Sequence, residues 1–258
     1  MDSRSLEYNV ICVKWGDKFS PEHVNRLYRM AKKNISLPFN FYCWTEDATG
    51  IYDDVKIIPL DQTLDLEAWW WKLTLFKENE LNGVSLFLDL DVVIQNNIDH
   101  LFDIAEHNKL TLIDRSIFGK IDIEKPTYCY DQMTQAMYNS SIMIWYANEN
   151  QDLYNKFIEN IPYYISIYSG IDRFFTYEIP PSKFKDVEVK NYYFRKEYFT
   201  DVFYYKEDQQ FSIKIKRPDR SEGGSQSRRV FFDKNKPICV FNGCHEDYFY
   251  KGMEGFLL

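Results

Sequence analysis

The amino-acid sequence predicts an α/β domain in which a mixed, mostly parallel sheet is flanked by helices. Strand-like and helix-like segments alternate through the first hundred residues, the order expected when helices cover the faces of a parallel sheet. The chain has 258 residues, 45% of them hydrophobic, and no linker rich in Pro, Gly or Ser divides it. This length suits one large core, so a single domain spanning 1–258 is expected.

The elements of the first half are indicated by local signals. Ser20, Pro21 and Glu22 predict a helix start, because Ser caps a helix, Pro fits the first helical position and an acid favours the first turn. This helix is expected to end near Asn34, and a second helix is expected at 67–79, where three tryptophans follow one another. Short apolar runs bounded by polar residues predict buried strands at 8–13, 39–44, 55–58 and 83–94.

The second half has a less regular pattern. Strands are expected at 110–113, 138–146 and 238–241, short helices at 98–102, 152–160 and 171–177, and meandering strands between 187 and 215. The segment 217–229 has the composition of a loop, and its basic residues outnumber its acidic residues. A mobile loop is the simpler interpretation, and the alternative is a lid whose arginines close over a phosphate.

The most informative stretch is the apolar run that breaks at Asp89 and Asp91. Alternate side chains of a strand share a face, so both carboxylates are expected to point the same way, with Leu90 in the core. Two like charges at the end of a buried strand are costly unless a positive group lies between them. Oxygen ligands of this kind suit Mg²⁺ and Mn²⁺. A bare Asp-x-Asp can also be a solvated strand end, but the return to apolar residues at 92–94 favours a metal site.

Charge and cysteine content exclude some classes of protein. The formal net charge is −8 and the basic residues are scattered, which argues against nucleic acid as the main partner. The five cysteines form no CxxC pair and mostly lie in apolar runs, so reduced, buried thiols are expected. No signal-peptide pattern and no membrane-spanning apolar run is present. A soluble cytoplasmic protein is therefore expected, and its oligomeric state stays open.

Six segments, in the same order along the chain, resemble the nucleotide-sugar glycosyltransferases of the GT-A fold. The resemblance is to the glycogenin and lipopolysaccharide-galactosyltransferase type (family 8) and to related viral and capsule enzymes. The segments are similar to the family's first nucleotide-binding strand (10–16), Lys-Leu helix (70–76), Asp-x-Asp strand (86–94), Asn-Ser-Gly segment (138–145), Gly-Asp-Gln-Asp segment (170–174) and Phe-His-Gly segment (240–243). Asn242 stands where the family carries its metal-binding His, and His245 follows three residues later, so both remain candidates.

This resemblance implies transfer of a sugar from a UDP- or GDP-linked donor to a glycan or glycoconjugate acceptor, with retention of configuration. It also implies a nucleotide-binding half at 1–105 and an acceptor half at 106–258. Mn²⁺ or Mg²⁺ would be held by Asp89, Asp91 and either His245 or Asn242. The remaining implied residues are Val13, Trp15, Thr45, Lys72 and Asp89 for the donor, and Asn139 and Asp172 as catalytic candidates that meet sugar hydroxyls.

Two other functions compete with this interpretation. A nucleotidyl or phosphotransfer enzyme also uses paired aspartates, but a Gly-rich phosphate loop is then expected after the first strand, where only Gly16 is found. A carbohydrate-binding protein without catalysis would use surface aromatics, but it predicts an all-β pattern. Individual candidates also have structural interpretations: Trp15 as core packing, Lys72 on a solvated helix face, and Asn139 bonded to backbone groups.

Overall fold

The computed structural model describes residues 6–114, 136, 138–187, 199–205, 210–216, 227–231 and 237–240. Asn242, His245 and most of the expected loop, residues 217–226, lie outside these residues. Residues 227–229, which were expected in that loop, instead belong to a strand.

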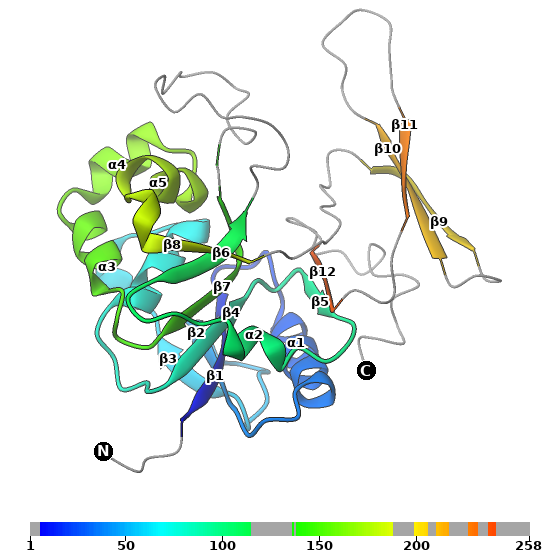
Figure 1. Ribbon diagram of the computed structural model, residues 1–258, viewed down its shortest axis with the longest axis horizontal. Coiled ribbons are helices and arrows are strands. Elements are labelled where there is room, and N and C mark those ends of the chain that lie inside the picture. Colours follow the sequence, from blue (N-terminus) through cyan, green and yellow to red (C-terminus); the bar gives the residue numbers. More distant parts are fainter. Residues whose placement is uncertain are drawn as a thin grey trace, which may run out of the picture.

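A seven-stranded sheet forms the centre of the fold, with the strand order β3-β2-β1-β4-β7-β6-β8 (Figure 1). Its strands are β1 (Tyr8–Lys14), β2 (Asn40–Thr45), β3 (Lys56–Pro59), β4 (Val84–Leu88), β6 (Leu110–Asp114), β7 (Tyr138–Tyr146) and β8 (Phe184–Val187). Strands β3, β2, β1 and β4 run parallel, β7 is antiparallel to both β4 and β6, and β8 is parallel to β6. The expected mixed, mostly parallel sheet is confirmed.

Helices cover both faces of this sheet (Figure 1). One face carries α1 (Pro21–Asn34) and α2 (His100–Asp103), and the other carries the 3₁₀ helix η2 (Ala68–Phe76) with α3 (Gln151–Ile158), α4 (Ile161–Ile167) and α5 (Ile171–Glu178). Short 3₁₀ turns are η1 (Gln62–Leu64) and η5 (Pro181–Lys183). Helix α4 was not expected from the sequence; the side chain of Asn160 caps it by accepting from the Tyr163 N–H.

Two smaller sheets complete the described structure. Strand β5 (Val92–Ile94) pairs antiparallel with β12 (Ile238–Val240). The strands β9 (Phe199–Tyr205), β10 (Gln210–Lys216) and β11 (Ser227–Phe231) form an antiparallel sheet, which accounts for part of the expected meander.

The first helix forms where the sequence predicts it. The Ser20 N–H donates to Nδ1 of His23, and Pro21 occupies the first turn. Lys32 and Lys33 lie in the last turn, where positive charge interacts favourably with the helix dipole. Local signals were sufficient here because the cap, the first turn and the buried stripe all lie within fourteen residues.

The second helix differs from the prediction. Residues 68–76 form a 3₁₀ helix rather than a longer α-helix, and all the residues from Trp70 to Phe76 are buried. Such a run presents no solvent face, so the 3.6-residue period that marks a surface α-helix is absent. The i→i+3 bonds from Trp70 to Glu67 and from Lys77 to Thr74 mark the two ends.

The Asp-x-Asp segment is a turn rather than part of a strand. Strand β4 ends at Leu88 and β5 begins at Val92, whose N–H donates to the Asp89 carbonyl at 3.1 Å. The Asp89 N–H donates to the Ser141 carbonyl of β7 at 3.0 Å. Leu90 is buried, as expected, but strand alternation does not determine where the two carboxylates point.

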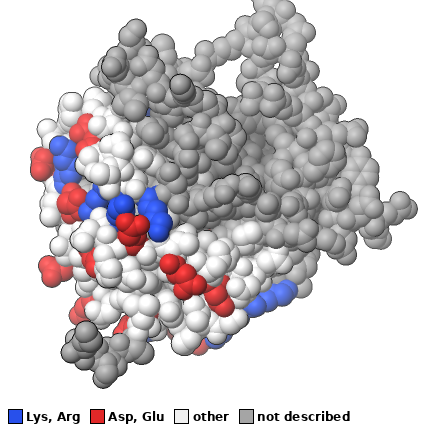
Figure 2. All heavy atoms as spheres, in the orientation of Figure 1, with Lys and Arg blue, Asp and Glu red and all other residues white. Residues whose placement is uncertain are grey.

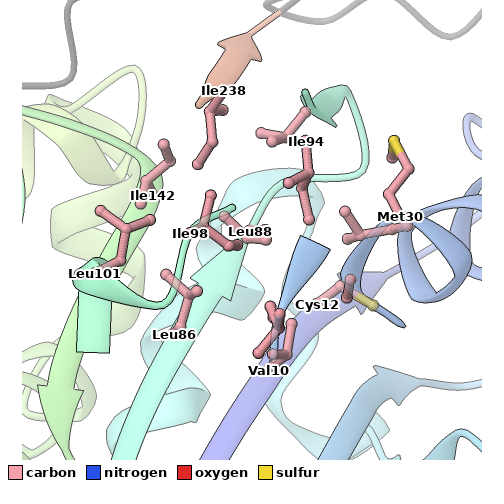
Figure 3. Close-up of a cluster of buried hydrophobic side chains, with 14 of the residues drawn as sticks. Val10, Cys12, Met30, Leu86, Leu88, Ile94, Ile98, Leu101, Ile142 and Ile238 are labelled. Carbon is pink, nitrogen blue, oxygen red and sulfur yellow. The ribbon is translucent and has the colours of Figure 1, made fainter. Parts of the chain in front are cut away.

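The sheet separates two cores of different composition. The core beside α1 and α2 is mainly aliphatic; Figure 3 shows part of this cluster, to which Met30 of α1 and strand residues such as Cys12 and Leu88 belong. The core beside η2, α3, α4 and α5 is rich in Trp, Phe and Tyr. Cys12, Cys43 and Cys239 are buried free thiols, as expected for these three.

The described surface carries both signs of charge. On the face shown in Figure 2, acidic and basic side chains of the described residues are interspersed. Within the described ranges, no helix has both the length and the apolar character needed to cross a bilayer.

Candidate active site

A buried lysine marks the centre of the candidate site. Nζ of Lys72, on η2, lies 2.7 Å from Oδ1 and 2.8 Å from Oδ2 of Asp89. The same ammonium donates to the carbonyl oxygen of Ser140 at 3.2 Å and to its Oγ at 3.3 Å, and it lies 5.1 Å from the ring centroid of Phe87. Lys72 is 8% exposed, so it does not lie on a solvated face. A buried ammonium is tolerated only when paired and hydrogen-bonded, and here it has both kinds of partner.

Asp172, in the first turn of α5, is the second acidic group of this cluster. Its Oδ1 accepts from the backbone N–H of Ser140 at 2.9 Å and from the Ser140 hydroxyl at 2.6 Å. Its Oδ2 accepts from the amide of Asn139 at 3.1 Å. The Asn139 carbonyl oxygen in turn accepts from the Ser141 N–H. The first residues of β7 are therefore fastened to the start of α5.

Ser140 joins the two acidic groups into one network. It contacts Lys72 on one side and Asp172 on the other, so Lys72, Asp89, Asn139, Ser140 and Asp172 are continuous through hydrogen bonds. Sequence reasoning noticed the Asn-Ser-Ser segment but did not select Ser140. A serine in a buried strand has no local pattern that separates a bridging role from ordinary packing.

The two aspartates have an oxygen donor set that fits a hard divalent cation. Asp91 is 5% exposed and lies two residues from Asp89 in the turn. Both oxygens of Asp89 already lie within 2.8 Å of Lys72, so this carboxylate would share its charge with the ammonium. In the part of the chain that the structure describes, no group of three or more His, Cys, Asp or Glu side chains gathers. The expected third ligand, His245 or Asn242, lies outside the described residues.

The other predicted donor residues lie at the ends of neighbouring strands. If the β1–β4 register is continued two places beyond Ile11 and Phe87, Val13 becomes level with Asp89. Val13 and Trp15 are partly buried and pack against the aromatic core. This placement brings Val13 near the network and agrees with the packing interpretation of Trp15.

The hydroxyl of Thr45, at the end of β2, forms hydrogen bonds within the loop that follows this strand. Its Oγ1 donates to the Asp47 carbonyl at 3.0 Å and accepts from the Asp47 N–H at 3.1 Å. Hydrogen bonds from Thr49 hold the pKa of the Asp47 carboxyl below its usual range, and Lys14 adds to the shift. The Thr45 hydroxyl therefore shapes the loop after β2, and no described contact joins it to the Lys72 network.

Comparison with known proteins identifies the fold. No protein-family description matches the sequence, and no curated protein matches it. Among solved structures, the galactosyltransferase LgtC in complex with donor and acceptor sugar analogs is similar with a TM-score of 0.60 and 10% identity, over 96% of this chain and 93% of that one.

Two further structures agree with this result. The glycosyltransferase GlyE of Streptococcus pneumoniae TIGR4 has a TM-score of 0.50 at 12% identity, over 71% of this chain and 46% of its own. The bifunctional glycosyltransferase WbbM has a TM-score of 0.50 at 10% identity, over 75% and 41%. At these identities the likeness concerns the fold, and the chain has the GT-A glycosyltransferase fold that the six sequence segments implied.

Proposed function

We propose that the protein is a metal-dependent glycosyltransferase that moves a sugar from a nucleotide diphosphate sugar to a glycan or glycoconjugate acceptor. The observation that carries this proposal is the network of Lys72, Asp89, Ser140 and Asp172 beside the carboxyl end of β4. Ligands of open α/β sheets bind at the carboxyl ends of the strands. The similar LgtC structure, which holds donor and acceptor sugar analogs, supports the same class of ligand.

Charge explains why the site suits a diphosphate. When the bond between the sugar and the diphosphate breaks, the leaving nucleotide takes negative charge with it, and preorganised positive groups stabilise that charge. Lys72 is such a group, held in place by Asp89 and Ser140. Asp91 and Asp89, with His245 or Asn242, would hold Mn²⁺ or Mg²⁺, which supplies Lewis-acid stabilisation of the diphosphate oxygens when bound.

The sugar would be oriented by Asp172 and Asn139. A carboxylate has about four acceptor positions, and three hydrogen bonds within the protein reach Asp172. Of its oxygens, Oδ2 accepts only the Asn139 amide among these bonds and has capacity for a sugar hydroxyl. Because the protein bonds fix the carboxylate, the hydroxyl would meet an acceptor that needs no reorganisation.

The nucleotide would lie over the ends of β1 and β2. Val13 and Trp15 offer apolar contact there, and the loop fixed by Thr45 borders the same edge. UDP and GDP are the proposed carriers, and retention of configuration follows from the family resemblance.

Calorimetric titration tests the proposal. UDP-, GDP- and dTDP-linked sugars are titrated into the protein with Mn²⁺ and again in EDTA. Binding of one donor is expected in Mn²⁺, and its loss is expected in EDTA. Asp91→Asn keeps the side-chain volume and should weaken metal-dependent donor binding about 100-fold, the upper end of the loss caused by removing a group that supports a metal site.

Asp103→Asn, an exposed acid in α2, is the matched control and should bind the donor like the parent. Thermal unfolding of both variants checks that the fold is retained. Donor binding that survives both EDTA and Asp91→Asn would contradict the metal assignment. No binding of any nucleotide sugar would favour carbohydrate binding without catalysis.

A further inference from the structure

Three consecutive tryptophans at the start of η2 lie in very different surroundings. Trp70 and Trp71 are 5% and 1% exposed, and they are part of the aromatic core. Trp69 is 46% exposed. Single exposed hydrophobic residues are common on protein surfaces, so exposure alone assigns no role. The role of this indole is instead inferred from its packing against Gly170 and from its position relative to Lys72 and Asp172.

The indole of Trp69 rests against Gly170, the residue before α5. A Cβ on Gly170 would lie 2.7 Å from Nε1 and 3.2 Å from Cδ1 and Cε2 of Trp69. The first of these distances is shorter than real Cβ contacts, so any side chain at Gly170 would displace the ring. The missing side chain lets the ring lie directly against the backbone, which limits its motion. A ring held in this way loses little conformational entropy when a ligand stacks on it.

Two relations along the chain link this ring to the candidate active site. In a 3₁₀ helix the side chains at i and i+3 eclipse each other, so Trp69 and Lys72 share one face of η2. On the other element, Gly170 precedes Asp172 by two residues, and Asp172 bonds Ser140. The exposed indole is therefore close to the network along two elements: it lies three residues before Lys72 on η2 and rests against Gly170, two residues before Asp172.

We propose that Trp69 is a stacking platform for a pyranose ring of the acceptor. A pyranose presents one face of C–H groups, and a Trp ring offers the largest flat apolar area of any side chain. This inference rests on the proposed glycosyltransferase function. It adds the group that would bind the second substrate.

The order of the sheet assigns the ring to the acceptor rather than to the donor. Strands β2 and β1, where the nucleotide would lie, are on one side of β4, and β7 is on the other. Helix α5, against which Trp69 rests, packs on the β7 side. A donor lying from β2 towards Asp172 would place its sugar at the network, and Trp69 would lie beyond it.

The kinetic test compares Trp69→Ala and Trp69→Phe with Tyr163→Ala, a variant of an exposed aromatic residue on α4. The donor found by calorimetry is combined with methyl glycosides of glucose, galactose and N-acetylglucosamine. Trp69→Ala should raise the acceptor KM about tenfold or more, as expected when one stacking ring is lost. Trp69→Phe should give a smaller increase. Hydrolysis of the donor without acceptor should keep its kcat/KM, and Tyr163→Ala should leave both reactions unchanged.

Gly170→Ala tests the support of the ring without removing it. The added methyl group should displace the indole and raise the acceptor KM in the same direction as Trp69→Ala. An unchanged acceptor KM in Trp69→Ala would overturn the proposal. An increase in donor KM alone would overturn the assignment to the acceptor and move the ring to the donor sugar.

A binding measurement separates this proposal from the proposed function. In ¹H–¹⁵N spectra, the indole signal that is missing in Trp69→Phe identifies Trp69 of the parent. Titration with the same methyl glycosides should shift that signal, whether or not any transfer occurs. Absence of donor binding with a shifted Trp69 signal would contradict only the transferase function. No shift with any of the glycosides would overturn the platform.

Discussion

The two faces of the central sheet differ in the side chains that cover them. On the side of α1 and α2 the core consists mainly of Val, Leu, Ile and Met, with Phe41 and Phe102 as its buried aromatic members in the described chain. On the side of η2 and α5, Trp, Phe and Tyr dominate. Lys72 and Asp172 both belong to elements on the aromatic side.

The two cores therefore differ in whether they contact the charged groups of the candidate site. The ring of Phe87 lies 5.1 Å from Nζ of Lys72, a distance at which the negative face of an aromatic ring attracts a cation. An aliphatic side chain offers no such attraction to a buried charge. The aliphatic core mainly provides burial, while the aromatic core also contacts the charged groups of the candidate site and packs against the helices that carry them.

Truncation of one large buried residue on each face of the sheet is among the changes expected to lower the free energy of unfolding most. Phe174 on α5 is 0% exposed and contacts Trp70, Phe157 and Tyr164. Phe174→Ala should lower the free energy of unfolding by about 3–5 kcal/mol. It should also lower kcat/KM for sugar transfer, because Asp172 lies two residues away on the same helix. Urea unfolding and kinetics at a low, permissive temperature measure the two effects.

Leu27→Ala is the comparison on the aliphatic side, where Leu27 is 0% exposed in α1. It should cost about 2–5 kcal/mol of stability and leave kcat/KM unchanged. If either alanine variant does not fold, Phe174→Leu and Leu27→Val apply the same comparison with smaller cavities. If the variants at Leu27 and Phe174 lost the same amount of activity, the proposal that only the aromatic core supports the candidate site would be wrong.

Replacement of Lys72 tests whether its buried positive charge is needed for sugar transfer. Lys72→Met keeps the apolar stem but leaves Asp89 without its ammonium partner. Breaking this buried pair should cost about 3–5 kcal/mol of stability. Transfer should slow by about 100-fold, because the group proposed to stabilise the charge of the leaving nucleotide is lost. Steady-state kinetics with the identified donor measure this change.

Lys77→Met is the control for this variant. Lys77 follows η2 directly, its side chain is 53% exposed, and its Nζ lies 3.8 Å from Asp61. Surface pairs of this kind contribute about 1 kcal/mol or less, so little change in rate or stability is expected. If the Lys72→Met variant transferred sugar as fast as the Lys77→Met variant, the buried ammonium would have a structural role only.

The smallest expected effect concerns an acid on the aliphatic side. Asp99, before α2, accepts from the Ser36 N–H and from the Asn97 amide, both at 2.9 Å. Burial alone would raise the pKa of Asp99, but these hydrogen bonds lower it below its usual value. Its ionised form therefore stabilises the fold above the unfolded pKa of about 3.9, and this contribution is lost as the pH falls through the lower folded value.

At pH 7, Asp99→Asn should lower the free energy of unfolding by about 1 kcal/mol. The difference in free energy of unfolding between parent and variant should become smaller between about pH 5 and pH 3. Urea unfolding at several pH values measures this trend. Transfer at pH 7 should be unchanged, because Asp99 has no described contact with the Lys72 network. A difference that stays constant down to pH 3 would show that ionisation of Asp99 does not stabilise the fold.

Local signals in the sequence predicted some elements well. Helix α1 begins and ends as expected because Ser20, Pro21 and the final lysines act on neighbouring backbone groups. Strand β7 also has its predicted limits, since an apolar run of that length favours a strand. The helix expected at 67–79 is a shorter 3₁₀ helix, and its residues from Trp70 to Phe76 are all buried, so the sequence there has no 3.6-residue pattern from which its form could be predicted.

The candidate site was predicted only in part, for the same reason. Asp89 was selected from the break in its apolar run, and Lys72, Asn139 and Asp172 were selected through the family resemblance. The described contacts bring these four residues together. Ser140 was missed because its role depends on the pairing of β4 with β7 and on the place of α5. The Asp-x-Asp turn was taken for a strand because the sequence does not show that β5 pairs with β12 instead of extending β4.

The spacing of the network along the chain has a consequence for synthesis of the protein. Lys72 and Asp89 are 17 residues apart, whereas Ser140 lies 68 residues after Lys72 and Asp172 a further 32. At a synthesis rate of about 5–20 residues per second, roughly 4–17 s separate the appearance of Asp89 and Asp172. During this interval the lysine and the first aspartate can neutralise each other, but the residue that we propose to bind the sugar, Asp172, has not yet been made. Under the proposed function, a ribosome-bound chain that stops before α5 lacks Asp172, and the candidate metal ligands Asn242 and His245 follow later still. The proposed transfer would therefore begin only after all of these segments have been made.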